Sequence, residues 1–252
     1  MSRPLGLVKG ADGRLWFGGS ATYGIGAIDT TGNVQYYPAP ICGQPSAGSF
    51  CELQIGAALG NRVWFTSVNR FGQYVGYIDV LTGVSQEFAL TPGDFFMGQP
   101  SQMTVGPDGN IWFLEFGKIG RATSAGQISV FNSGQANTYI ITGPDDKLWY
   151  EGVNSRGDGY INRISIHGKM LPGGAAAAGS GEMTIGPNNQ VWVATGRGFI
   201  HFKGRYNYRT ITISEPYTTC QTAGLTVGSD NNLWFNAIGC PYGIGTIAPK
   251  DT

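Results

Sequence analysis

Residues 103–115 read MTVGPDGNIWFLE: a short apolar run, a polar turn, and a second apolar run that contains Trp112. Asp, Gly and Asn in the turn supply the backbone freedom that a tight hairpin needs. Weaker copies of this pattern surround every tryptophan of the chain, namely Trp16, Trp64, Trp112, Trp149, Trp192 and Trp234. Successive tryptophans are 48, 48, 37, 43 and 42 residues apart. Self-similarity at this period is a signature of propellers and solenoids.

Each repeat continues with two further β-rich runs, which in the third repeat are residues 118–121 and 128–131. Four short strands in roughly 40 residues are typical of a propeller blade. No segment keeps a 3.6-residue period, so almost no helix is expected. We therefore predict an all-β chain, a six-bladed β-propeller of four-stranded antiparallel blades, as a single domain over residues 1–252. The predicted blades are residues 4–38, 49–90, 99–132, 136–170, 180–214 and 222–252.

Three details follow from the repeat. The sixth blade reaches its third strand near Ile247 and the sequence given stops at Thr252, so we expect either a three-stranded sixth blade or a sequence that is a trimmed piece of a longer chain. The run Ala175–Ala178 lies between Pro- and Gly-rich segments and is predicted to be a loop. Each tryptophan is interpreted as an apolar filler between neighbouring sheets rather than as a ligand-binding aromatic.

The composition restricts the partners. Charged residues make up 13% of the chain and the net charge is zero, which leaves no electrostatic footprint for nucleic acid or an anionic membrane. The predicted partners are therefore a small molecule, a glycan or a protein. A monomer is expected, with association through the open edge of the sixth blade as the alternative.

The four cysteines are predicted to form two local disulfides, Cys42–Cys51 and Cys220–Cys240. Each would stabilise the fold by about 3 kcal/mol through loop closure. Four buried free thiols are the alternative, and a zinc site is disfavoured because no Cys-x-x-Cys spacing occurs. Disulfides favour a secreted, periplasmic or extracellular protein, and since residues 1–4 contain no apolar signal core, a removed signal peptide is expected.

The run 103–115, followed by Lys118–Arg121, resembles the blade repeat of the virginiamycin B lyases, also called streptogramin lyases. The resemblance extends in weaker form over essentially the whole chain. It implies a propeller that opens a cyclic depsipeptide by elimination, with a histidine as base and a Mg²⁺ held partly by a glutamate. In the family pattern this histidine lies five residues before the repeat glycine, and the glutamate lies three residues after the tryptophan.

This chain departs from that pattern. The six positions that correspond to the family's histidine, called the base positions below, hold Leu5, Cys51, Ser101, Thr138, Gly181 and Ala223. The six glutamate positions hold Gly19, Ser67, Glu115, Gly152, Thr195 and Ala237. Ser101 and Glu115 are thus the family-position candidates for catalysis, and Glu115 is the candidate ligand for Mg²⁺ or Ca²⁺. Because a serine without a nearby base is a poor replacement, efficient virginiamycin B lyase activity is not expected.

Other polar residues receive structural interpretations. His167 is predicted to lie in a solvent-facing turn, and His201 inside the third strand of the fifth repeat. Glu151 lies two residues after Trp149, at the same end of its strand as Glu115. Paired carboxylates bind hard cations, but a difference of one residue in register sends the two side chains to opposite faces. Two solvated loop acids are therefore the default interpretation.

Loop length indicates where a ligand binds. The turns between strands one and two, and between three and four, are short, whereas the connections at the other end of each blade are long. These long loops are residues 18–23, 38–50, 68–74, 90–100, 152–160, 170–181 and 214–222. Long loops on a rigid scaffold usually carry binding, although loops that pack on themselves are the alternative. The candidates are Tyr23, Arg70, Tyr74, Phe95, Phe96, Glu115, Glu151, Arg156, Tyr160, Tyr217 and Tyr242.

Three classes of function remain open at this point. The first is a secreted binding module that recognises a small molecule, glycan or protein partner on the long-loop face. The second is a streptogramin lyase-like C–O lyase with an altered active site. The third is a structural propeller domain of a larger cell-surface protein. An acid–base pair at the channel mouth would favour the second class.

Overall fold

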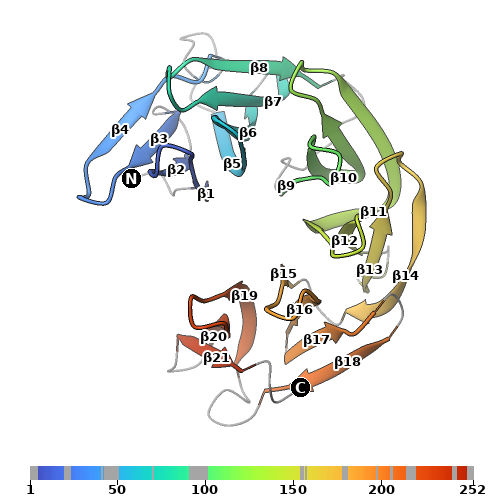
Figure 1. The fold of residues 1–252 in the computed structure, drawn as a ribbon. Coiled ribbons are helices and arrows are strands. Elements are labelled where there is room, and N and C mark those ends of the chain that lie inside the picture. Colours follow the sequence, from blue (N-terminus) through green and yellow to red (C-terminus); the bar gives the residue numbers. More distant parts are fainter. Residues whose placement is uncertain are drawn as a thin grey trace. The chain divides into compact units, whose positions relative to one another are not determined.

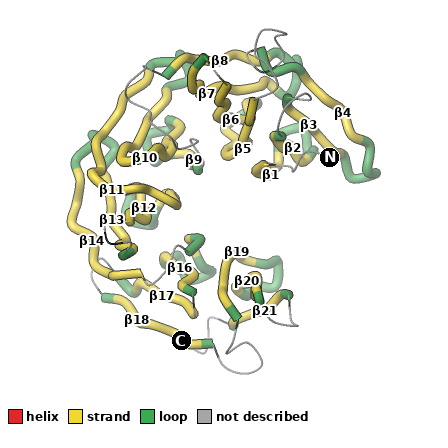
Figure 2. The backbone as a smooth tube through the Cα atoms, turned by 180° about the vertical axis from the view of Figure 1, so that it is seen from behind, coloured by secondary structure: helices red, strands yellow, loops and turns green. Residues whose placement is uncertain are grey.

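The computed structural model describes residues 5–19, 24–40, 42, 51–69, 71–90, 102–153, 156, 158–177, 181–196, 198–204, 207–213, 220–239 and 243–248. Their regular structure is entirely β-strand, as Figure 2 shows. They contain no helix with the length and apolar character that a membrane crossing requires. The chain divides into two compact units, residues 1–105 with 109–132, and residues 106–108 with 133–252.

The first unit contains the first two predicted blades as separate four-stranded antiparallel sheets (Figure 1). One sheet is formed by β1 (Leu5–Lys9), β2 (Leu15–Gly18), β3 (Ile25–Ile28) and β4 (Val34–Tyr37). The other is formed by β5 (Cys51–Leu59), β6 (Arg62–Asn69), β7 (Gly72–Asp79) and β8 (Ser85–Ala89). In both sheets the strands follow one another in sequence order, as expected for propeller blades.

The third and fourth blades share one six-stranded sheet in the order β14-β13-β12-β11-β10-β9. Two long strands explain this. β10 (Ile111–Ala122) contains both the tryptophan strand and the third strand of its blade, and β11 (Ile128–Thr142) continues from the fourth strand of the third blade into the first strand of the fourth. The other strands are β9 (Met103–Val105), β12 (Leu148–Val153), β13 (Gly159–Ile164) and β14 (Met170–Ala177).

The fifth blade is a four-stranded sheet and the sixth a three-stranded one. The fifth contains β15 (Met183–Ile185), β16 (Val191–Thr195), β17 (Gly198–Phe202) and β18 (Tyr208–Thr212). The sixth contains β19 (Gln221–Val227), β20 (Leu233–Ile238) and β21 (Ile244–Ile247). In the described part of the chain, the predicted six-bladed all-β architecture with a three-stranded last blade is therefore confirmed.

Two predicted loops are strands instead. The alanine run enters β14, where Ala175, Ala176 and Ala177 pair with Ile161, Tyr160 and Gly159 of β13. Backbone pairing with an adjacent strand outweighs the weak local preference of alanine and glycine. The connection over residues 68–74 is also shorter than predicted, because Asn69 pairs with Gly72 in a tight hairpin. The Asn69 side-chain oxygen accepts the backbone N–H groups of Phe71 and Gly72, which closes that turn locally.

The packing of the tryptophan explains the glycine that precedes it by six residues. A side chain at Gly10 would collide with the Trp16 indole, and the same holds for Gly143 with Trp149 and for Gly186 with Trp192. Only glycine lets the indole lie flat over this turn. The indole then fills the space between sheets, and five of the six tryptophans are at most 4% exposed.

Trp234 differs from the other five, since it is 38% exposed. Along β20, Leu233, Phe235 and Ala237 are buried, whereas Trp234 and its alternate neighbours lie on the exposed side. The prediction that every tryptophan is buried between sheets is therefore wrong for this one. Strand alternation places Trp234 on the more exposed face of the last described blade.

Candidate functional site

The structure describes only part of the predicted long-loop site. Seven sequence-predicted residues lie outside the described residues: Tyr23, Arg70, Phe95, Phe96, Ser101, Tyr217 and Tyr242. The five that are described are Tyr74, Glu115, Glu151, Arg156 and Tyr160. Tyr74 and Glu115 belong to the first unit, and the other three belong to the second.

The predicted disulfide between Cys42 and Cys51 is present, with Cα atoms 5.5 Å apart. Cys51 is buried at the start of β5 and occupies a base position, so no free thiolate is available there. Cys220 is also disulfide-bonded, and its predicted partner Cys240 lies outside the described residues. The alternative of four free thiols is excluded for the three described cysteines.

Glu151 is completely buried rather than solvated, which corrects the default interpretation for this residue. It lies near the end of β12, and its Oε2 accepts the Thr138 hydroxyl at 2.6 Å and the Gly181 backbone N–H at 3.2 Å. Burial raises the pKa of Glu151, although these two hydrogen bonds oppose the shift. Thr138 and Gly181 both occupy base positions. In the fourth and fifth blades, the residues at the positions of the family's histidine therefore donate hydrogen bonds to the Glu151 carboxyl.

A second hydrogen bond from a backbone N–H of one blade to a glutamate of the preceding blade occurs one blade later. Glu182 Oε2 accepts the Leu225 backbone N–H at 2.9 Å, so a glutamate of the fifth blade holds the first strand of the sixth. The Thr222 hydroxyl donates to the carbonyl oxygens of Thr195 and Gly198 in the same region. Sequence reasoning did not find Glu182, because nothing local distinguishes an acid that bonds a neighbouring blade from a surface acid. At these positions Glu151 and Glu182 connect successive blades.

Glu115 is also buried, with 3% of its surface exposed, although it was expected to be a loop acid. It lies in β10, three residues after Trp112, where the long strand continues past the usual blade end. Ser101, its predicted partner, is outside the described residues. Both predicted loop acids are thus strand residues whose position in a sheet, not their polarity, determines their burial.

The described residues do not fit the implied metal. No group of three or more His, Cys, Asp and Glu side chains among them converges as a metal site would require. The Oε2 of Glu151 already accepts hydroxyl and amide donors, and burial raises the pKa of this carboxyl, which opposes the charged form that Mg²⁺ and Ca²⁺ bind best. No step through a metal ion is therefore derived for this chain.

The two histidines lie where they were predicted. His167 is exposed in the turn between β13 and β14. His201 is buried in β17, where its ring stacks on Trp192 with centroids 4.1 Å apart and its Nε2 bonds the Gln190 side-chain oxygen. Burial lowers the pKa of His201, and the nearby Lys203 and Arg209 lower it further. Trp192 and Gln190 therefore hold the His201 ring inside the fifth blade.

Several bulky side chains remain accessible at the long-loop end of their blades. Phe71, between β6 and β7, is 61% exposed, and Tyr160, in β13, is 36% exposed. Arg156, between β12 and β13, is exposed as well, whereas Tyr74 is half-buried in β7. Aromatic side chains at strand ends present rigid, partly apolar contact surface.

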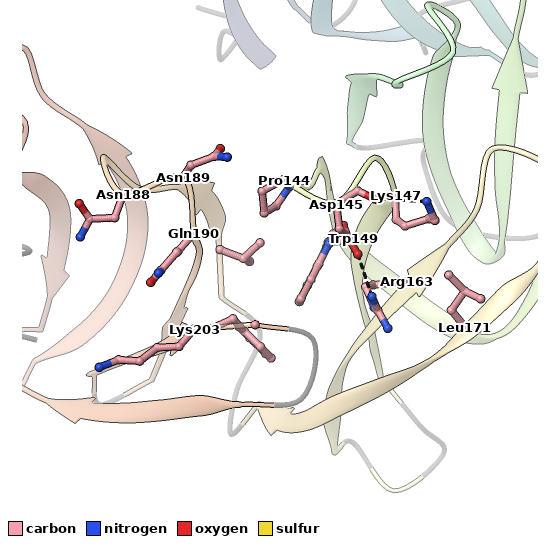
Figure 3. Close-up of a pocket in the computed structure, with 13 residues that line it drawn as sticks. Pro144, Asp145, Lys147, Trp149, Arg163, Leu171, Asn188, Asn189, Gln190 and Lys203 are labelled. Atoms are coloured by element: carbon pink, nitrogen blue, oxygen red, sulfur yellow. Dashed lines mark hydrogen bonds and ion pairs between the residues drawn. The ribbon is translucent and has the colours of Figure 1, made fainter.

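A groove of about 650 Å³ lies at the opposite, short-turn end of the fourth and fifth blades (Figure 3). Asp145 is central to one wall, because its Oδ1 accepts the Trp149 indole N–H at 2.7 Å and its Oδ2 accepts Arg163 Nη1 at 2.7 Å. None of the sequence-predicted site residues borders this groove. The lining residues are Pro144, Asp145, Lys147, Trp149, Arg163, Leu171, Asn188, Asn189, Gln190, Val191, Phe202, Lys203 and Gly204.

The blade repeat and the residues that surround each tryptophan relate the chain to a known family. The sequence profile of the Virginiamycin B lyase family matches residues 1–203 and residues 54–252. The chain belongs to the virginiamycin B lyase family. No curated protein matches the sequence significantly.

Solved structures agree with the fold. Virginiamycin B lyase from Staphylococcus aureus is 24% identical over 99% of this chain and 82% of its own, with a TM-score of 0.74. A catalytically inactive histidine-to-alanine variant of that enzyme, with quinupristin, is 22% identical over 100% and 83%, with a TM-score of 0.71. A gluconolactonase from Xanthomonas campestris is 12% identical over 98% and 86%, with a TM-score of 0.61. At these identities the likeness establishes the propeller fold and leaves the activity to the residues of this chain.

Proposed function

We propose that this chain is a small-molecule-binding propeller of the virginiamycin B lyase family that does not perform the family's elimination. The observation that carries the proposal is the use of the base positions. Thr138 and Gly181 hydrogen-bond the buried Glu151, and Cys51 is in a disulfide. The sequence places no histidine at any of the six base positions.

The groups nearest to those positions are poor substitutes for the missing base. Elimination needs a group that removes a weakly acidic proton, and a positioned base contributes about 10²–10⁴-fold to such a step. Glu151 is completely buried, and its Oε2 already accepts two hydrogen bonds. His201 is held between Trp192 and Gln190 inside the fifth blade. The rate enhancement of a general base is therefore not expected here.

A protein can bind a ligand without converting it, and the side chains at the long-loop end favour such binding. Tyr160 exposes aromatic surface at this end of the fourth blade, and Arg156 of the same unit adds a cation. A ligand held by ring stacking and one charge needs no acid–base group. The structure of the inactive lyase variant with quinupristin makes a small molecule the ligand class that we propose.

The Cys42–Cys51 disulfide is compatible with an extracellular or periplasmic location. We extend the proposal to a secreted protein on this ground. A cytosolic chain would keep these thiols reduced, because the cytosolic thiol pool opposes disulfide formation. Non-reducing peptide mapping of protein recovered from its native compartment tests this part, and free Cys42 and Cys51 in that material would contradict it.

Calorimetric titration of the full chain with quinupristin tests the binding proposal. We expect saturable binding that Tyr160→Ala weakens about fivefold or more, since an exposed aromatic contact contributes about 1 kcal/mol. Tyr208→Ala is the matched control, because Tyr208 is 42% exposed at the short-turn end of the fifth blade. No saturable binding, or equal weakening by both variants, would contradict a ligand at the long-loop end.

One observation favours the alternative of a lyase with an altered active site. Glu115 keeps the family's glutamate position and is buried there. If this alternative holds, the chain opens a cyclic ester in a reaction that Glu115→Gln abolishes. Unchanged turnover in Glu115→Gln, or no turnover in either protein, excludes this role for Glu115.

A further inference from the structure

We propose that the buried carboxyl of Glu151 is a pH-sensitive clasp between the fourth and fifth blades, closed when the carboxyl is protonated and loosened when it is ionised. The clasp goes beyond the proposed function, because it needs no ligand. Its parts are a carboxyl without exposed surface, a hydrogen bond from Thr138 within the fourth blade, and a hydrogen bond from Gly181 of the fifth. All three residues belong to the second unit.

One carboxyl oxygen connects the two blades. Oε2 of Glu151 accepts the hydroxyl of Thr138, in β11, and the backbone N–H of Gly181, which lies two residues before β15. The backbone of Glu151 is paired with Tyr139 in β11 and with Ile161 in β13. Because these two strands hold β12 on both sides, water reaches the carboxyl only when the contact with the fifth blade opens.

The other carboxyl oxygen makes the charged form costly. Oε1 of Glu151 is buried and has no hydrogen-bond partner among the described residues, and none of their cations pairs with this carboxyl. A carboxylate with an unpaired oxygen and no counter-ion is far more costly to bury than the neutral acid. Burial accordingly raises the pKa of Glu151, and the hydrogen bonds from Thr138 and Gly181 offset only part of the shift.

The titratable and charged groups around Glu151 do not supply the missing positive charge. Burial raises the pKa of Tyr139, on β11, and the negative charges of Glu182 and Glu151 raise it further, so these three groups lie near one another. On β13 the residue that pairs with Glu151 is apolar. Arg156 and Asp158, in the connection between β12 and β13, are exposed to solvent. Ionisation of Glu151 therefore adds negative charge in a place that already holds an acid.

The direction of the pH effect follows from proton linkage. When the contact opens, Glu151 meets water and its pKa returns towards the ordinary value of 4.5. The closed contact binds the proton more tightly, so its stability is complete below pH 4.5 and is lost as the pH rises through the closed-state pKa. Each unit by which the closed-state pKa exceeds the open-state pKa increases the open population about tenfold.

Amide hydrogen exchange of the full chain, measured by NMR from pH 4.5 to pH 8, tests the clasp. After correction for intrinsic exchange, the protection of the Gly181 amide is expected to fall at least about threefold relative to that of Leu225. The Leu225 amide is the internal reference, because it donates an equivalent bond to Glu182, which is only half-buried. The ratio of the two amides removes any acid effect that the fifth blade transmits to both.

Two variants assign the fall in protection to its group. Glu151→Gln keeps the shape and an acceptor oxygen but cannot ionise, so the pH dependence of Gly181 protection is expected to disappear. Glu182→Gln is the matched control and is expected to retain the fall. A fall of wild-type size in Glu151→Gln, its loss in Glu182→Gln, or its absence in the wild type would overturn the clasp.

Thr138→Val keeps the proposal testable if the glutamine variant does not fold. It removes one hydrogen bond to the charged carboxyl and leaves the carboxyl itself, so the midpoint of the fall is expected to move to higher pH. An unchanged midpoint would show that a group other than Glu151 titrates. Binding of quinupristin has no part in these measurements, so failure of the proposed function would leave their outcome unaffected.

Discussion

The fourth and fifth blades each carry a tryptophan at the same place in their second strand, but the polar side chains around the two tryptophans differ. In the fourth blade Trp149 pairs across the sheet with Arg163, and Asp145 bonds both the indole and the guanidinium. In the fifth blade Trp192 pairs with His201, and Asn188 stands where the other blade has Asp145. The indole N–H of Trp192 and the Nδ1 of His201 have no hydrogen-bond partner among the described residues.

This difference separates what the blade requires from what it tolerates. The tryptophan is at most 4% exposed in both blades. Both blades also keep the same turn, in which Asp146 and Asn189 have a φ of 54°. The polar network is therefore not needed to place the indole, which apolar contact already fixes. Instead, this network adds stability to the fourth blade. The fifth blade lacks it and contains the pair of Trp192 and His201, whose neutral ring is sensitive to pH.

The largest expected effect is the loss of the fourth-blade network. Asp145→Ala removes the carboxylate that forms an ion pair with Arg163, whose side chain is 4% exposed, and that accepts the Trp149 N–H. We expect a loss of about 2–3 kcal/mol in the free energy of unfolding, which is less than for a fully buried pair because the Asp145 side chain is 35% exposed. Urea denaturation measures it. Asn188→Ala, at the same place in the fifth blade, is the control and is expected to cost less than about 0.5 kcal/mol.

The fifth blade is expected to lose stability in acid. The pKa of His201 is lowered in the folded protein from an ordinary value of 6.5, so the unfolded chain binds the proton first as the pH falls. The stability contributed by the neutral ring is complete above pH 6.5 and decreases below it until the folded-state pKa is passed. His201→Phe keeps the stacking on Trp192 and removes the titration. Denaturation at pH 7.5 and 5.5 should show a larger loss in the wild type than in the variant, and equal losses would refute this origin.

Supplying the missing acceptor should make the fifth blade resemble the fourth. Asn188→Asp introduces a carboxylate where Asp12, Asp145 and Asp230 accept the indole N–H of their own blades at 2.7–3.0 Å. We expect a gain of about 1 kcal/mol at pH 7.5, since one buried N–H is satisfied. A loss of stability would show that the turn of the fifth blade cannot present a carboxylate to Trp192.

The smallest effect concerns a feature that the two blades share. Asp146 and Asn189 have left-handed backbone conformations, at the place where Gly109 serves in the third blade. Asp146→Ala and Asn189→Ala should each cost about 0.5–1 kcal/mol, and the glycine variants should stay within about 0.5 kcal/mol of the wild type. Unequal costs in the two blades would mean that the turns differ in more than their side chains.

The fold was largely predictable because its determinants are local. The tryptophan spacing and the Asp, Asn and Gly turns specify the hairpins, and these alone place most strands. The errors in the predicted strands occur where pairing with a neighbouring strand, rather than local sequence, determines the backbone conformation. The alanine run around Ala176 has little intrinsic strand preference and becomes a strand only because β13 lies beside it.

The site was less predictable, because burial and hydrogen-bond partners arise between blades. Glu115 and Glu151 look like loop acids in sequence, and only the sheets show that both are buried. The contact of Glu151 with Gly181 joins residues 30 positions apart, which no local pattern encodes. The groove beside Trp149 was missed for the same reason, since its walls belong to turns that sequence reasoning regarded as merely short.

Incubation of the full chain with virginiamycin B and Mg²⁺ tests the central claim most directly. Elimination opens the ring without changing the mass, so chromatography with tandem mass spectrometry must follow the product. We expect an intact ring under conditions in which the Staphylococcus aureus lyase converts its substrate completely. Ring opening at a comparable rate, abolished by Glu115→Gln, would contradict it and show that an elimination site exists without a histidine at the base positions.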